Sequence, residues 1–426
     1  MTHAIPRNGA TVSRTLCALG CVAVALSASS ARARQTADGD RADDTFLLVT
    51  RDFKVQSVQL AAINDQSLVI MQDDRGWVTL DLKQCIALFN ADGETPTHPA
   101  RGMLLLADGQ RLPGEAVVGA EPAPDTLVWN HPWLGRVDVP FKLISSVLLT
   151  PDAVAPAPGN ADVVLLANGD RQEGFVTAIG DPVTIEVSTG GAAAASQALN
   201  IPLERVTAIT MIAPRQTGKG RRIWFSEGTV LDVQSIAVGD DGYVRLGAGG
   251  LIGAGGAGAG GAGGAAVNPA AGPQPPRIPL TEVAGVLFDR EAMIPLASIA
   301  LSRVEGPATR YVIPRPSNSD PDAALGLSAI EYSGPIVARY ALPAGCQRFI
   351  ADAELPRDAR TWGDCELVVR SDDEEIFRTH LSSATPVASI NVPVKGRELT
   401  IEVAAGAHGP IQDLVRLHRP MLLKGK

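Results

Sequence analysis

Residues 201–209, Ile-Pro-Leu-Glu-Arg-Val-Thr-Ala-Ile, carry the pattern that decides the fold, because similar runs occur at three other places in the chain. In each copy a proline or an aspartate is followed, four and seven residues later, by an apolar residue or a cysteine. A pattern that recurs in one register predicts an array of small structural units in place of one large domain. Copy by copy, the three aligned positions are Asp81, Cys85 and Leu88; Pro140, Ile144 and Val147; Pro202, Val206 and Ile209; and Pro279, Val283 and Val286.

A tight turn lies upstream of each run. Asp108-Gly109 and Asn168-Gly169 follow apolar stretches in copies two and three, and Gly228 follows a third such stretch in copy four. Copy one, near Asp52-Phe53, lacks the glycine. Asp-Gly and Asn-Gly between apolar runs predict β-hairpins with type I′ turns, which need a positive φ at both central residues.

The segments after each hairpin alternate apolar and polar residues, which is typical of half-buried strands. Units of about 60 residues with four or five such strands resemble SH3-like and Sm-like small β-barrels in turn placement and in the closing strand. Cys85 takes the place of Ile144, Val206 and Val283, and this position predicts a buried, unreactive thiol. We expect an all-β protein with the following organisation: a signal peptide at 1–33; β-repeats at 47–90, 102–150, 162–212 and 221–289; a Gly/Ala-rich loop at 247–276 inside the fourth repeat; and a C-terminal jelly-roll β-sandwich at 295–426.

The N-terminus has the pattern of a secretion signal. Arg7 and Arg14 precede the apolar stretch 16–26, and Ala31-Arg32-Ala33 is a small-x-small cleavage site. The stretch is too short to span a membrane. A lipoprotein signal ending at Cys21 is the alternative. We expect an exported protein that is periplasmic, cell-surface or secreted, with no transmembrane segment after cleavage.

Composition narrows the classes of function. Cleavage after Ala33 removes three arginines and no acid, which takes the net charge from −9 to −12. An acidic exported chain is a poor nucleic-acid binder. The contents of charged residues (19%) and of aromatic residues (4%) are low for an enzyme with a large packed core and fit a β-rich exported protein.

The last third contains an ordered series of strands over about 295–426. Its pieces are Tyr340 to Pro343, Arg348 to Ala351, Leu367 to Phe377, Lys395 to Leu399 and the strand from Asp413 to Pro420. This series resembles the NPCBM family of carbohydrate-binding modules, which have a galactose-binding-like jelly-roll fold. The resemblance implies a sandwich that binds a glycan or a cell-envelope polysaccharide.

The chain departs from that family at two places. A stretch that usually contains a histidine is Gly334 to Arg339 here, and Leu417-His418 stands where tryptophan is common. These departures favour a second class of function, a structural or protein-interaction scaffold whose module no longer binds sugar. Both classes remain open at this point.

Sugar binding usually needs an aromatic platform and a few fixed polar groups. Trp362 lies in a loop-like stretch beside charged residues, and stacking platform and packing residue are both open interpretations for it. The candidate ligand-binding residues are Trp362, Arg360, Asp364, Asp413 and His418. A second candidate surface is the stretch Trp129, His131 and Trp133, interpreted either as an exposed interaction tip for a protein partner or as a tryptophan pair covering its own barrel.

Other chemistry has little support in the sequence. Cys346 and Cys365 lie in one domain, and a disulfide between them is a hypothesis for an oxidising compartment. The six histidines show no metal-ligand spacing, and no Gly-x-Ser-x-Gly or Cys-x-x-Cys motif occurs. The acidic cluster at 372–375 is interpreted as a solvated turn, with a cation site as the alternative. We therefore expect no enzyme activity, no cofactor and no metal; an unrecognised hydrolase is a third class.

Overall fold

The computed structural model describes residues 45–425, apart from 73–75, 92–101, 120–124, 158, 189–195, 215, 240, 248–276, 308–315 and 317–322. Within these residues the regular structure consists of β-strands and short 3₁₀-helices, and no α-helix occurs among them. The all-β fold class expected from the sequence is confirmed. The expected signal peptide and the Gly/Ala-rich segment lie outside the described residues, apart from Gly247 at the end of one strand.

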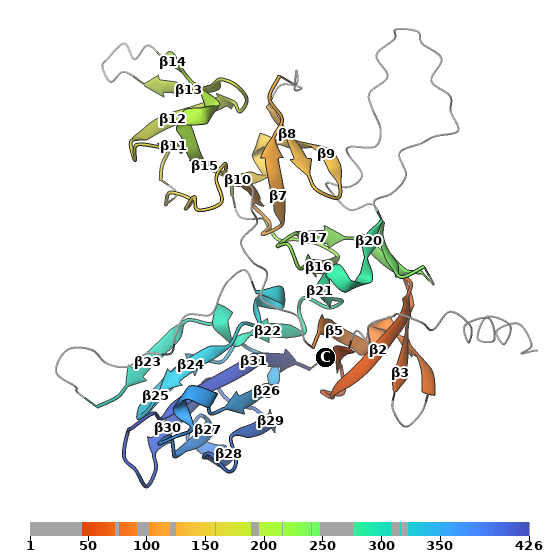
Figure 1. The fold of residues 1–426 in the computed structure, drawn as a ribbon, viewed down its shortest axis with the longest axis vertical. Helices are drawn as coiled ribbons and strands as arrows, with labels where there is room; N and C mark the ends of the chain where they lie inside the picture. Colours follow the sequence, from red (N-terminus) through yellow and green to blue (C-terminus); the bar gives the residue numbers. More distant parts are fainter. Residues whose placement is uncertain are drawn as a thin grey trace, which may run out of the picture. The chain divides into compact units, whose positions relative to one another are not determined.

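Four repeats share one order of elements (Figure 1): several strands, a 3₁₀ turn and a closing strand. In each repeat the first strand pairs antiparallel with both the second and the closing strand. Repeat 1 is β1 (Thr45–Thr50), β2 (Val55–Ile63), β3 (Ser67–Gln72), β4 (Gly76–Asp81), η2 (Leu82–Gln84) and β5 (Cys85–Asn90). Repeat 2 is β6 (Gly102–Leu106), β7 (Arg111–Ala116), β8 (Thr126–His131), β9 (Gly135–Pro140), η3 (Phe141–Leu143) and β10 (Ile144–Leu148).

Repeats 3 and 4 repeat this plan, except that the long second strand is interrupted at Gln234 in repeat 4. Repeat 3 is β11 (Asp162–Leu166), β12 (Arg171–Ala178), β13 (Val183–Ser188), β14 (Ser196–Ile201), η4 (Leu203–Arg205) and β15 (Val206–Thr210). Repeat 4 is β16 (Arg221–Phe225), β17 (Val230–Val233), β18 (Ser235–Val238), β19 (Tyr243–Gly247), β20 (Ile278–Pro279), η5 (Leu280–Glu282) and β21 (Val283–Leu287).

The recurring nine-residue run builds the 3₁₀ turn and the closing strand. Pro140, Pro202 and Pro279 precede the 3₁₀ turns with φ of −61°, −54° and −59°, values that the proline ring favours by itself. In repeat 1 Asp81 has φ −69°, and its carboxylate accepts the Lys83 amide proton at 2.8 Å. The two later positions of each run are at most 3% exposed and share one hydrophobic core cluster, Cys85 among them. Burial raises the pKa of the Cys85 thiol to about 12, in keeping with an unreactive cysteine.

The hairpin turns occur where the sequence predicted them, but their type differs from the prediction. Gly109, Gly169 and Gly228 have φ of +84°, +87° and +95°, whereas the residues before them are not in the positive-φ region. Each glycine amide donates to the carbonyl three residues back, at 2.9–3.0 Å. This is a type I turn followed by a left-handed bulge residue, so type I′ was wrong. Phe53 takes the glycine place in repeat 1, with φ +63°.

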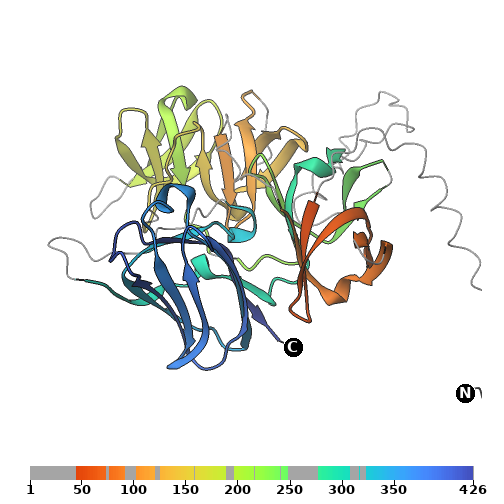
Figure 2. The ribbon, with the colours of Figure 1, turned by 60° about the horizontal axis from the view of Figure 1, so that its bottom comes forward.

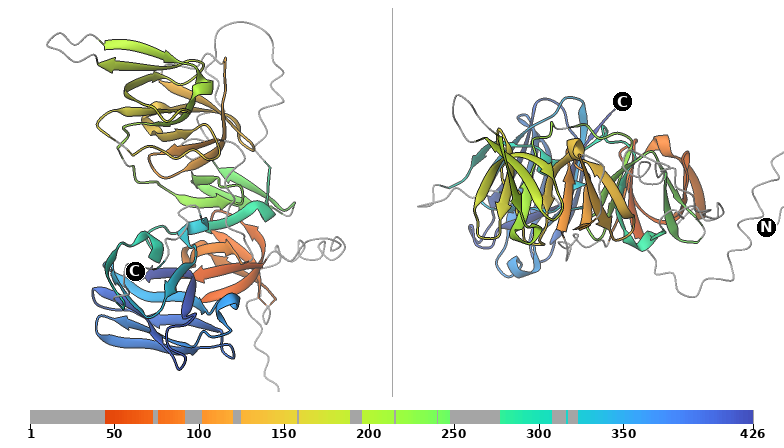
Figure 3. Two further views of the ribbon diagram at one scale, coloured as in Figure 1. Left: turned by 60° about the vertical axis from the view of Figure 1, so that its left-hand side comes forward. Right: turned by 90° about the horizontal axis from the view of Figure 1, so that it is seen from above.

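The closing strands join the repeats in pairs (Figure 3). β5 pairs with β21, placing Leu88 opposite Val286, and β10 pairs with β15, placing Val147 opposite Ile209. These four residues occupy the same position in the four copies of the recurring run. Each pairing therefore brings the same surface of two repeats together, as a two-fold axis would.

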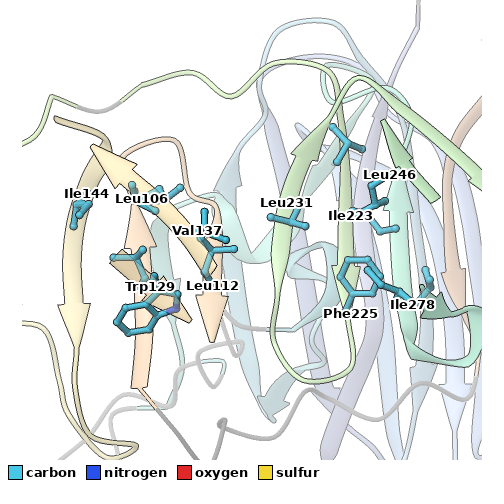
Figure 4. Packing of buried hydrophobic residues seen from close by; sticks show 14 of the residues in the cluster. Leu106, Leu112, Trp129, Val137, Ile144, Ile223, Phe225, Leu231, Leu246 and Ile278 are labelled. Carbon is cyan, nitrogen blue, oxygen red and sulfur yellow. The ribbon is translucent and has the colours of Figure 1, made fainter. Parts of the chain in front are cut away.

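Repeats 2 and 4 also meet. Val230 of β17 pairs with Arg111 of β7, and both lie two residues after the glycine of their turns. Buried residues of all four repeats belong to one hydrophobic cluster. Within it, Figure 4 shows two groups: Leu106, Leu112, Trp129, Val137 and Ile144 inside repeat 2, and Ile223, Phe225, Leu231, Leu246 and Ile278 inside repeat 4.

The C-terminal domain is a sandwich of two five-stranded antiparallel sheets around a separate core (Figure 2). The first sheet contains β22 (Met293–Pro295), β24 (Ile330–Ser333), β26 (Cys346–Glu354), β29 (Val387–Pro393) and β31 (Leu414–Lys424). The second contains β23 (Leu301–Glu305), β25 (Ile336–Ala341), β27 (Cys365–Ser371), β28 (Glu374–Leu381) and β30 (Glu398–Ala405). Three 3₁₀ turns connect these strands: η6 (Leu296–Ser298), η7 (Ala324–Gly326) and η8 (Arg357–Ala359).

A third apolar cluster joins the sandwich to repeats 1 and 4. Ile350 and Met421 of the sandwich share this cluster with Ile86, Phe89 and Trp224 of the repeats. The side-chain amide of Asn391 also donates to the carbonyl of Phe53 at 3.1 Å. The contact uses the middle of β26 and the end of β31, so the loops at the start of β31 remain available.

Candidate functional site

Two loops of the sandwich form the candidate site. One follows η8 and leads into β27, and the other, 406–413, connects β30 to β31. Their contact is close, because a Cβ on Gly363 would lie 2.6 Å from the carbonyl oxygen of Ala359 and 2.7 Å from that of Gln412. The Trp362 amide donates to the side-chain oxygen of Gln412 at 3.0 Å. Glycine at 363 thus allows the loops to pack together and present Trp362.

Asp364 is the fixed polar group of this site. One carboxylate oxygen accepts the Ala407 amide at 3.0 Å and lies 3.6 Å from Nδ1 of His408; the other contacts Nε2 of His380. The hydrogen bond from Ala407, then that from His380, hold the pKa of Asp364 below its usual value. Asp364 is therefore an anion flanked by two imidazoles, whose side chains are 55% and 58% exposed.

Asp413 supports Asp364 from inside. Its side chain is 3% exposed, and one of its oxygens accepts the Asp364 amide at 3.3 Å. Its other oxygen has no hydrogen-bond partner in the described part of the chain. Burial raises the pKa of Asp413, and the charge of Asp364 adds to the rise. The two neighbouring carboxyl groups therefore differ, because the pKa of Asp364 is lowered and that of Asp413 is raised.

Trp362 supplies the apolar surface. It is 56% exposed and meets the His408 ring edge to face, with 6.4 Å between ring centroids. Ile411 on the second loop is also exposed. The site therefore combines an exposed indole with a carboxylate and two imidazoles, which suits a ligand that has both a C–H face and hydroxyl groups.

The five predicted ligand residues separate into two groups. Trp362, Asp364 and Asp413 come together as described above. Arg360 and His418 instead bind the two carboxylate oxygens of Glu354, at 3.0 and 2.7 Å. They bind Glu354 at the end of β26 and are not among the groups that surround Asp364.

His380, His408 and Gln412 were missed by the sequence analysis. His380 reaches the site because β28 pairs with β27, with His380 opposite Glu366, two residues after Asp364. His408 reaches it through the turn that closes with the bridge between Gly406 and Gly409. Neither histidine has a local motif, and only the pairing of distant strands reveals them.

Of the two interpretations of Trp129, His131 and Trp133, the exposed interaction tip is wrong. Trp129 and His131 are 0% and 1% exposed, and Trp133 is half-buried. Trp129 is buried in the core of its repeat, whereas Trp133 packs edge to face on Phe225 of repeat 4 at 5.3 Å. The apolar tip is covered because repeats 2 and 4 meet there.

The structure does not contain the disulfide that was a hypothesis for Cys346 and Cys365. Cys346 and Cys365 are both free thiols. Cys346 begins β26 in one sheet, opposite Lys424, and Cys365 begins β27 in the other, opposite Ala405. Cys365 is fully buried in the sandwich core, and burial raises its pKa to about 12.

The acidic cluster at 372–375 forms a turn with partners of its own. One carboxylate oxygen of Asp372 accepts the amides of Arg397 and Glu398, both at 2.9 Å, and Glu375 binds Arg378 at 2.7 Å. Across the described residues, no group of three or more His, Cys, Asp or Glu side chains is placed to hold a metal ion. The described residues contain no helix with the length and apolar character needed to cross a membrane.

Comparison with known proteins gives weak likenesses only. No family model matches the chain, and no curated protein matches it. Among solved structures, a CBM51 module from Clostridium perfringens GH95 in complex with methyl-galactose is 14% identical, over 30% of this chain and 99% of that one, with a TM-score of 0.26. The CBM51-2 and INT domains of Clostridium perfringens ZmpB are 14% identical with a TM-score of 0.26, over 31% of each chain. This chain thus spans about a third of the length of that structure.

Proposed function

We propose that the protein is exported, is not an enzyme, and binds a glycan through the loop site of its C-terminal sandwich. The observation that carries the proposal is the exposed Trp362 beside Asp364, which is itself fixed between His380 and His408. The resemblance of the strand order to carbohydrate-binding modules supports the same function. Export rests on the signal pattern of residues 1–33.

Each group has a role that its chemistry suits. The C–H face of a sugar ring stacks on the indole of Trp362, where water is released from both surfaces. Asp364 accepts a hydrogen bond from a sugar hydroxyl, and bonds to a charged acceptor are stronger than neutral ones. The exposed rings of His380 and His408 flank that hydroxyl and offer further donors or acceptors.

A glycan array tests the proposal on the mature chain, residues 34–426. The chain should bind to a subset of the glycans on the array. Trp362→Ala should weaken binding to these glycans roughly tenfold, because one stacking contact is lost. Trp77→Ala is the matched control, because Trp77 is 51% exposed but lies in repeat 1. Equal binding by all three proteins would place the glycan elsewhere.

A scaffold function is the second candidate. It is favoured by the apolar cluster that attaches the sandwich to repeats 1 and 4 and by the paired closing strands. A folded mature chain that binds no glycan on the array would support the scaffold function and contradict glycan binding.

A further inference from the structure

A buried hydrogen-bonded relay crosses the contact between repeats 2 and 4. His131 ends β8, and its Nε2 lies 2.8 Å from the hydroxyl of Thr229, in the turn between β16 and β17. That hydroxyl in turn donates to a carboxylate oxygen of Glu227. The second oxygen of Glu227 is buried and has no partner within the described residues. Glycan binding uses none of these groups.

The geometry fixes which nitrogen of His131 carries the proton. Nδ1 accepts the backbone amides of Trp133 and Leu134, at 3.2 and 3.1 Å. An atom that accepts two N–H groups cannot carry a hydrogen of its own. The single ring proton is therefore on Nε2 and is donated to Thr229, so the relay runs from His131 through Thr229 to Glu227.

A second proton on His131 has no place in this arrangement. It would sit on Nδ1 and point at two amide hydrogens, which would break both hydrogen bonds. Those bonds hold the turn that carries Trp133, and Trp133 packs on Phe225 of repeat 4. Protonation at Nδ1 thus acts on the apolar contact between the repeats as well as on the relay.

The other charged groups of this contact do not supply a positive charge beside Glu227. Glu282 of η5 lies beside Glu227 and contacts Ser226, so its like charge disfavours a second negative charge there. Elsewhere in the contact, Arg222 and Arg290 bind Asp232 at 2.6 and 2.7 Å, and Arg111 of β7 lies opposite Val230.

We propose that the contact between repeats 2 and 4 is a proton-operated joint, closed while His131 carries one proton and opened when it takes a second. Burial lowers the pKa of His131 to about 4, and burial raises the pKa of Glu227 to about 7. The joint therefore loosens around His131 and Trp133 as the pH falls toward 4, while the Arg222 bond to the Asp108 carbonyl and the Asp232 amide bond to Gln110 still hold repeats 2 and 4 together.

Hydrogen–deuterium exchange of the mature chain tests the joint between pH 7 and pH 3.5, with rates corrected for the intrinsic effect of pH. Amides in 126–134 and 226–233 should lose protection at least tenfold near pH 4, while those of β27 and β30 in the sandwich keep theirs. In His131→Asn the loss should vanish, because the Asn oxygen can replace Nδ1 as acceptor and cannot be protonated.

An equal loss of amide protection in His131→Asn, or no loss of protection in the unaltered chain, would overturn the proposal of a proton-operated joint. If His131→Asn does not fold, His131→Gln takes its place as the non-titrating variant. A loss of protection that spreads evenly over the sandwich would indicate general acid unfolding and would also contradict the proposal.

Discussion

Asp364 is the residue on which the proposed site depends. Its backbone amide, its two carboxylate oxygens and its neighbours Gly363 and Cys365 are all engaged by other parts of the sandwich. A group held in this way loses little freedom when a ligand binds, which favours affinity. The exposed side chains around it, Trp362, His380 and His408, are then the parts of the site that meet the ligand.

Glu227 and His131 make opposite contributions to stability as the pH changes. Between pH 4.5 and about 7 the folded protein keeps Glu227 protonated while the unfolded chain has lost that proton, so the free energy of unfolding falls with rising pH. Between about pH 4 and 6.5 the unfolded chain protonates His131 and the folded protein does not, so the free energy rises with pH. The two contributions nearly cancel from pH 4.5 to 6.5.

Glu227→Gln should remove the contribution that makes the free energy of unfolding fall with pH, which leaves the rising contribution of His131. We expect the free energy of unfolding of this variant to increase by about 2–3 kcal/mol from pH 4.5 to 6.5, relative to the unaltered chain. Urea unfolding at several pH values measures the difference. Parallel curves for the two proteins would show that Glu227 does not keep its proton in the folded state.

At this scale the sequence could show which residue types are present but not which of them meet. Trp362 and Asp364 were predicted because they are neighbours in one polar loop. His380 and His408 could not be, since 16 and 44 residues separate them from Asp364. Burial of His131 was likewise hidden, because its partner Thr229 belongs to repeat 4.

The elements follow from short stretches whose geometry is local. Proline before the closing strand sets φ for the 3₁₀ turn, and glycine takes the left-handed position of each hairpin. The same Ile-Pro-Leu triplet occurs once more, at 294–296, and again precedes a 3₁₀ turn. There the preceding strand β22 pairs with β31 of the sandwich, so the local pattern predicts the turn and not the sheet it joins.

Two glycines of repeat 3 should differ in their response to alanine. A Cβ on Gly174 would clash with the carbonyl oxygen of Glu186 and lie 2.9 Å from Ile185, whereas a Cβ on Gly169 would meet no atom within 4 Å. We expect Gly174→Ala to lower the free energy of unfolding by about 2–4 kcal/mol and Gly169→Ala by about 1 kcal/mol, the cost of its positive φ alone. Urea denaturation of both variants measures this. Equal losses would mean that β12 and β13 do not approach as closely as described.

At the scale of the whole molecule, pairing departs from chain order. Repeat 1 pairs with repeat 4, and repeat 2 with repeat 3, each through equivalent positions of the closing strands. The four copies and their strands could be predicted from the sequence, because their signals lie within about 60 residues. Which repeat pairs with which could not be predicted from the sequence, because all four closing strands have the same apolar pattern and any two of them could pair.

The sandwich is attached by a face that leaves its loop site uncovered. Ile350 and Met421 contact the repeats, while Trp362 and Ile411 remain exposed on the loops before β27 and β31. A binding module held by one face on an array of repeats, with its loop site exposed, is the arrangement that the proposed function needs.

Calorimetric titration of the mature chain with a glycan selected on the array is the most direct test of this account. Asp364→Asn keeps an oxygen for the Ala407 amide but removes the charge, and we expect it to weaken binding at least tenfold. Glu366→Gln is the control, since Glu366 lies two residues away and binds Arg378. Weakening by Asp364→Asn alone is the predicted result; unchanged affinity in both variants would contradict a glycan site at Asp364.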